Sequence, residues 1–186
     1  MKINKFYFLF LMILFSSCLA QTNKKEKINT KINKDYFASR KSFSGKLNPD
    51  EYKQIRELIT SELKTQIADN YAILINYKQL GTNCFEFGLN DKNALKVIDK
   101  GIEISSRLSS TFNAKDFFVY SADALNRERI ETRKKYILDS GFFQKNIFTL
   151  QENCSAFFIL KPNGEFMKYY GGDYYSEVEY FLQKND

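Results

Sequence analysis

The sequence predicts an α/β fold in which helices cover both faces of a mixed sheet. Segments with helical periodicity alternate along the chain with short apolar runs, a pattern typical of strands joined by helical crossovers. Strands connected through helices pair in parallel. In contrast, Asn163-Gly164 between the last two apolar runs favours a tight antiparallel hairpin. Helices on both faces of such a sheet give three layers.

The first helix is predicted over residues 49–69. Asn48 can cap it, Pro49 suits its first position and Glu51 completes a capping box. Apolar residues recur along it at spacings of three and four, which gives one buried face. This pattern leaves open whether the helix lies on a face of the sheet or covers an edge.

Two buried strands flank the second helix. Residues 71–77 (YAILINY) form a continuous apolar run, which indicates a strand buried on both faces. A loop over residues 78–90 follows and contains Cys84, and an amphipathic helix is expected over residues 91–108. The next strand is expected at residues 116–122 (DFFVYSA).

The second half of the chain completes the sheet. The highly charged residues 126–139 predict a helix with a solvated face, and the aromatic residues 142–150 predict a packed connection. Strands at 155–161 and 165–170 flank the hairpin turn, and an amphipathic helix at 174–184 follows. The expected domain therefore has a mixed four-stranded sheet and an additional N-terminal helix.

The beginning of the chain resembles a bacterial export signal. Lys2 and Lys5 precede an uncharged apolar run at residues 6–15. This run is too short to cross a bilayer as a helix, which takes about 20 residues. Its hydrophobicity has no single face, which argues against a helix of the fold. We therefore expect a signal peptide over residues 1–20.

Two processing routes overlap at the end of this segment. Small residues precede Gln21 in the pattern that suits signal peptidase, which releases a free secreted protein. The sequence FSSC, which ends at Cys18, resembles a lipobox instead. In that case the signal covers residues 1–17, and a lipid on Cys18 tethers the protein to the membrane. The two routes remain alternatives, and both predict export, to the periplasm or as a membrane-anchored lipoprotein.

Positive charge is concentrated before the predicted domain. Residues 21–46 contain eight basic and two acidic side chains with isolated apolar residues, which predicts a basic flexible tether or a loosely docked arm. Such a segment can also contact an anionic membrane. The predicted domain, residues 47–186, has eighteen basic and twenty acidic side chains. Nucleic acid is not an expected partner, because phosphate binding requires Lys and Arg clustered on the domain itself.

The chain contains no histidine. His-based catalytic triads, His-ligated zinc sites and imidazole acid–base chemistry are therefore excluded. Dinucleotide-binding, phosphate-binding, EF-hand, zinc-protease and nucleophile-elbow motifs are absent as well. We predict no cofactor and no metal site, and the sequence favours a role other than catalysis.

From residue 71 onward, the expected order of elements resembles a thioredoxin-like domain of the exported, periplasmic type. AILINY at 72–77 is similar to the strand that leads into the active-site loop of that superfamily, and AFFILKPNGEF at 156–166 is similar to its closing hairpin. Gly171 and Gly172 stand where a glycine follows that hairpin. The resemblance implies a thioredoxin-like three-layer fold.

Two features of that superfamily are missing. The loop that carries its CxxC motif has only Cys84, and Cys154-Ser155 stands where a cis-proline precedes the third strand. Dithiol exchange is therefore not implied. The resemblance implies instead a degenerate member that acts as a binding or scaffold module for an unidentified protein or peptide partner in the bacterial envelope.

The resemblance also implies that Cys84 and Cys154 are neighbours, because the segments that carry them lie against each other in that fold. Three interpretations stay open: two separately buried thiols, a structural disulfide, or an active thiol pair. An active pair is either a soft-metal site or an atypical thiol–disulfide redox centre, and it requires a reactive thiolate at Cys84. The redox protein is the alternative function.

Tyrosines gather beside two glycines near the end of the sequence. Exposed tyrosines in such a setting can form a peptide- or glycan-binding surface. Alternation along a strand and the start of a helix would instead place part of them in the core. Four are candidate binding residues: Tyr169, Tyr170, Tyr174 and Tyr175.

Overall fold

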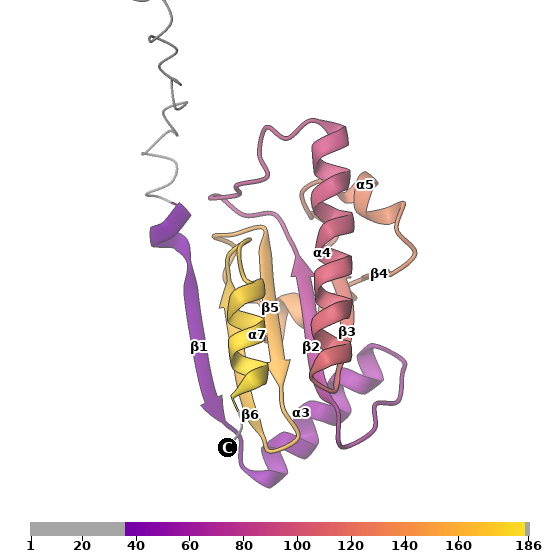
Figure 1. Cartoon of the computed structure of the whole chain (residues 1–186), viewed down its shortest axis with the longest axis vertical. Coiled ribbons are helices and arrows are strands. Elements are labelled where there is room, and N and C mark those ends of the chain that lie inside the picture. The colour runs from indigo at the N-terminus through magenta and orange to yellow at the C-terminus, as the bar shows by residue number, and fades with distance from the viewer. Residues whose placement is uncertain (1–35, 185–186) are drawn as a thin grey trace, which may run out of the picture. The chain divides into compact units, whose positions relative to one another are not determined.

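The computed structural model describes residues 36–184 (Figure 1). The predicted signal peptide, Cys18 and residues 21–35 of the predicted tether lie outside the described residues. The strands are β1 (Lys41–Lys46), β2 (Ala72–Lys78), β3 (Ala114–Tyr120), β4 (Tyr136–Leu138), β5 (Ser155–Leu160) and β6 (Glu165–Tyr170). The helices are α3 (Pro49–Glu62), α4 (Asp91–Thr111), α5 (Arg127–Glu131), α6 (Phe142–Asn146) and α7 (Tyr175–Gln183).

The strands form one mixed sheet in the order β1-β6-β5-β2-β3-β4. The central strand β2 pairs in parallel with β3 and antiparallel with β5, and β6 pairs antiparallel with β5. The predicted α/β class with a mixed sheet is confirmed. The prediction of four strands is wrong, because β1 and β4 extend the sheet to six.

The edge strand β1 lies in the segment that was expected to be a tether. It pairs antiparallel with β6, from Lys41 opposite Tyr170 to Lys46 opposite Glu165. All its residues are exposed. An edge strand that is covered on neither face needs no apolar alternation, so its sequence gives almost no strand signal. The expectation of a flexible tether is therefore wrong for these residues.

The predicted helix over residues 126–139 is wrong in its second half. The helix α5 ends at Glu131, and Tyr136–Leu138 pair in parallel with β3 as β4. The charges that suggested a solvated helix face have another role. The guanidinium of Arg133 donates two hydrogen bonds of 2.7 Å to the carboxylate of Asp99 on α4, which attaches the connection between α5 and β4 to that helix.

Alternate side chains of β2 contribute to two hydrophobic clusters, one on each face of the sheet. Ile73 and Ile75 belong to a cluster with Ile59 of α3 and Phe143 of α6. Leu74 belongs to the opposite cluster, which includes side chains of α4 and α7. Figure 1 shows α4 and α7 together on one side of the sheet. The additional N-terminal helix α3 therefore lies on a face of the sheet and not at its edge.

The start of α3 is as predicted, and its end is earlier. The side chain of Asn48 accepts the N–H of Glu51, and the carboxylate of Glu51 accepts the N–H of Asn48, both at 2.9 Å. The helix ends at Glu62, and Lys64 adopts a φ of +49°. The buried guanidinium of Arg56 then binds the carbonyl groups of Ile67 and Ala68 at 3.0 and 2.6 Å, which holds the following loop.

Replacing Asn48 with alanine should lower the free energy of unfolding by about 1 kcal/mol, because the N–H of Glu51 loses its side-chain acceptor. Asn90→Ala is a matched control at the start of α4. The side chain of Asn90 accepts the N–H of Asn93 at 3.0 Å. Urea unfolding should show losses of similar size for the two variants, because each removes one side-chain cap acceptor. An unchanged free energy of unfolding for Asn48→Ala would contradict a stabilising role of this cap.

Candidate functional site

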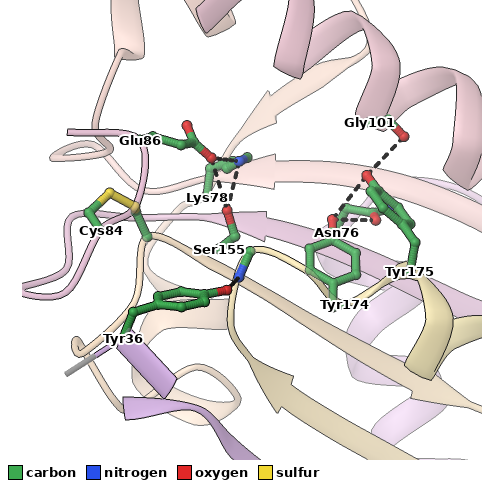
Figure 2. Close-up of polar contacts among 11 residues, drawn as sticks. Tyr36, Asn76, Lys78, Cys84, Glu86, Gly101, Ser155, Tyr174 and Tyr175 are labelled. Atoms are coloured by element: carbon green, nitrogen blue, oxygen red, sulfur yellow. Dashed lines mark hydrogen bonds and ion pairs between the residues drawn. A yellow bond between two sulfur atoms is a disulfide. The ribbon is translucent and has the colours of Figure 1, made fainter. Parts of the chain in front are cut away.

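The candidate site is the end of the sheet where β2 leaves for α4 (Figure 2). There the loop over residues 79–90 lies against the segment that precedes β5. The N–H of Asn83 donates to the carbonyl of Glu152 at 2.8 Å. A Cβ atom on Gly81 would lie only 2.5 Å from the carbonyl carbon of Asn153. The missing side chain at Gly81 therefore lets the two segments approach each other closely.

Cys84 and Cys154 form a disulfide between these two segments, with their Cα atoms 5.2 Å apart. The expectation that the two cysteines are neighbours is confirmed, and the interpretation as two separate thiols is wrong. Both residues are buried, with 7% and 3% of their surface exposed. Thiol–disulfide exchange begins when a thiolate reaches one of the sulfur atoms. Burial blocks this approach, which favours a structural role for the bond.

A buried ion pair lies beside the disulfide (Figure 2). Lys78 ends β2, and its ammonium donates to the carboxylate of Glu86 at 2.5 Å and to the hydroxyl of Ser155 at 2.7 Å. The Ser155 hydroxyl in turn donates to Glu86 at 3.3 Å. The side chains of Lys78 and Glu86 are only 13% and 4% exposed. These contacts join the loop to two adjacent strands.

The contact between Ser155 and Lys78 does not make a nucleophile. A lysine that activates a serine must be neutral to accept its proton. The Lys78 nitrogen is instead the donor in its contacts with Glu86 and Ser155. Ser155 is also only 2% exposed, so a substrate has no access to its hydroxyl. No sequence pattern marks this cluster, because a lysine at a strand end and a glutamate in a loop are ordinarily solvated residues.

Residues just before β1 dock onto the same end of the domain. The hydroxyl of Tyr36 accepts the N–H of Gly172 at 2.7 Å (Figure 2). The same hydroxyl donates to Asp173 at 2.9 Å. Its ring meets that of Phe85 edge-on, with centroids 5.8 Å apart. Arg40 forms an ion pair with Asp173 at 2.9 Å. Burial first, and then the hydrogen bond to Asp173, raise the pKa of Tyr36 to about 12.

This raised pKa predicts a loss of stability in alkali. An unfolded Tyr36 ionises near its ordinary pKa of 10.0 and a folded one near 12. The contribution of Tyr36 to the free energy of unfolding should therefore be complete below pH 10 and decrease as the pH rises towards 12. In urea unfolding, the stability difference between the wild type and Tyr36→Phe should shrink above about pH 10. Tyr180→Phe, at a residue 69% exposed, is the control. A difference independent of pH would contradict the expectation.

The four tyrosines proposed as a binding surface are mainly part of the core. Tyr169, Tyr170 and Tyr174 are 7%, 0% and 3% exposed. The hydroxyl of Tyr174 donates to the buried Asn76 at 2.8 Å (Figure 2). Tyr175 is partly buried, and its hydroxyl donates to the carbonyl of Gly101 at 2.9 Å. The expected exposed surface is therefore wrong for the first three residues, and alternation in and out of the core explains them.

Large apolar side chains are exposed around the disulfide instead. We call this set the loop patch. Its exposed fractions are between 41% and 53%, and its members are Phe37, Leu80, Phe85 and Phe87. Glu86 lies between two of these phenylalanines and is only 4% exposed. This part of the loop thus reverses the usual arrangement, because it buries its charged residue and exposes its apolar ones.

Among residues 36–184, no group of three or more His, Cys, Asp or Glu side chains is arranged to hold a metal ion. The same part of the chain contains no helix with the length and apolar character required to cross a membrane. No family model, curated protein or solved structure is significantly similar to this chain, so its function has to be inferred from the site itself.

Proposed function

We propose that this protein is an exported thioredoxin-like binding or scaffold module of the bacterial envelope, without a dithiol active site. The observation that carries the proposal is the reversed loop beside the disulfide. Phe85 and Phe87 are 41% and 53% exposed, whereas Glu86 between them is buried. Contiguous exposed apolar side chains in a soluble domain mark interaction sites.

The sheet topology supports the thioredoxin-like part of the proposal. The strands β3, β2, β5 and β6 are adjacent in that order, and only the β2–β3 pair among them is parallel. The loop after β2 and the segment before β5 meet, as they do in that superfamily. The strands β1 and β4 are then additions at the two edges.

Preorganisation of the loop favours binding over thiol exchange. The disulfide, the ion pair between Lys78 and Glu86 and the hydrogen bond from Asn83 fix the loop before any partner arrives. Binding to a fixed loop costs less conformational entropy than binding to a flexible one. Exposed phenylalanines held in this way suit a protein or peptide partner that supplies an apolar anchor. The buried sulfur atoms do not suit a redox enzyme.

Site-specific photo-crosslinking in the native cells tests the binding surface. A photoreactive phenylalanine analogue at position 87 should give a discrete crosslinked product, whereas the same analogue at position 180 should not. Tyr180 is the matched control, because it is 69% exposed and lies on α7. Excess purified wild-type protein should abolish the product, and excess Phe85→Ser protein should not. Identical products from both positions would overturn the proposal.

Two measurements test the other parts of the proposal. The purified protein should not accelerate the reduction of insulin by a dithiol, and turnover would favour the redox alternative based on Cys84 and Cys154. Mass spectrometry of the protein from its native cells should find either a diacylglyceryl adduct on Cys18 or a chain that starts at Gln21. A chain that retains residues 1–17 would overturn export.

A further inference from the structure

An apolar groove lies between α3 and α6, on the sheet face opposite α4 and α7. Its volume is about 280 Å³. It is separate from the loop patch and plays no part in the proposed function. Side chains of both helices and of the strands β5 and β6 form its walls, among them Ile55, Leu58, Ile147, Phe158, Phe166 and Lys168.

Among residues 36–184, Lys168 is the only charged residue in the wall of this groove. It points to the same face of β6 as Phe166 and Tyr170, because alternate residues of a strand share a face. Its ammonium donates to the carbonyl of Ile147 at 2.8 Å and lies 5.2 Å from the centre of the Phe43 ring. This one donated hydrogen bond leaves two of its three N–H groups for a ligand.

Lys168 differs in this respect from two other lysines with little exposed surface. Lys78 pairs with Glu86 at 2.5 Å, and Lys161 pairs with Glu165 at 3.4 Å. Within residues 36–184, no carboxylate lies within ion-pair distance of Lys168. Burial accordingly lowers the pKa of Lys168. A partly buried cation without a counter-ion is costly, and a bound anion would remove that cost.

We propose that this groove binds a free medium-chain fatty acid, with its acyl chain among the apolar side chains and its carboxylate on Lys168. The walls select an apolar chain, and the single cation selects an anionic end. At about 30 Å³ per water-sized group, the groove accommodates a ligand of on the order of ten heavy atoms. Octanoate has this size.

Calorimetric titration of the full chain with three probes tests the site. Octanoate has both the chain and the charge, octanol has the chain alone, and acetate has the charge alone. We expect binding of octanoate that is at least about tenfold tighter than that of octanol, and no measurable binding of acetate. No binding of octanoate at millimolar concentration, or equal binding of octanoate and octanol, would overturn the proposal.

Variants identify the residues involved. Lys168→Met should weaken the binding of octanoate at least about tenfold and leave the binding of octanol unchanged. Lys115→Met, at an exposed lysine of β3, is the matched control and should change neither. If Lys168→Met does not fold, Leu58 provides a second test, because its side chain is 53% exposed. Leu58→Glu places a negative charge beside the groove and should weaken octanoate more than Leu58→Gln does. Equal octanoate binding by Lys168→Met and Lys115→Met, or by Leu58→Glu and Leu58→Gln, would place the ligand elsewhere.

Discussion

Removal of the disulfide by the double substitution Cys84→Ser and Cys154→Ser is expected to lower the free energy of unfolding by about 4 kcal/mol. The bond joins residues that are 70 positions apart. In the chain-entropy model, a crosslink over a loop of this length restricts the unfolded chain strongly and the folded chain hardly at all. The loss therefore comes chiefly from a larger unfolded ensemble.

Urea unfolding of three samples measures this effect: the oxidised wild type, the wild type reduced while unfolded, and the double variant. The last two should agree with each other and unfold at lower urea than the first. Mild reductant applied to the folded wild type should leave its unfolding midpoint unchanged, because both cysteines are buried. Equal midpoints for all three samples would show that the crosslink adds no stability. Ready reduction of the disulfide in the folded protein would favour the redox alternative.

Replacing Lys78 with methionine should lower the free energy of unfolding by about 3–5 kcal/mol. The substitution leaves the carboxylate of Glu86, which is 4% exposed, without its cation. A buried charge without a partner costs far more than the ion pair gains. The loop should also lose its attachment to β2, because the lysine ammonium is the shared donor to Glu86 and Ser155.

A double variant separates the cost of the orphaned charge from that of lost packing. Lys78→Met combined with Glu86→Leu replaces the ion pair by apolar side chains and should recover most of the lost stability. Lys100→Met is the control, because its pair with Glu103 is 60% and 69% exposed and should contribute less than about 1 kcal/mol. A similar loss of stability for Lys78→Met and Lys100→Met in urea unfolding would contradict the expectation that breaking the buried pair costs more than breaking the exposed one.

The central part of the fold was predictable because its strands are buried on both faces. The run at 72–77 and the hairpin at Asn163-Gly164 have strong local signals, and the capping box at Asn48 marks the start of α3. The edge strands β1 and β4 were missed. Their pairing depends on backbone hydrogen bonds to β6 and β3, which leave no periodic trace in the sequence.

The site was predictable only through the resemblance that made Cys84 and Cys154 neighbours. Charge and hydropathy assign Glu86 to the surface and Phe85 to the core, and the folded loop does the reverse. A loop has no regular period, so its sequence does not show which side chains point inward. The choice of face depends on Lys78 and Ser155, which come from two strands far apart in the chain.

The covalent link between Cys84 and Cys154 also affects how the protein withstands proteases. The connection between α5 and β4 presents Lys134 and Lys135 at the surface, and it lies between the two cysteines in the chain. A cut there produces two fragments that stay joined through sulfur. A nicked molecule would therefore keep its mass on a non-reducing gel and separate only after reduction. Cleavage at this exposed connection does not release either half of the domain.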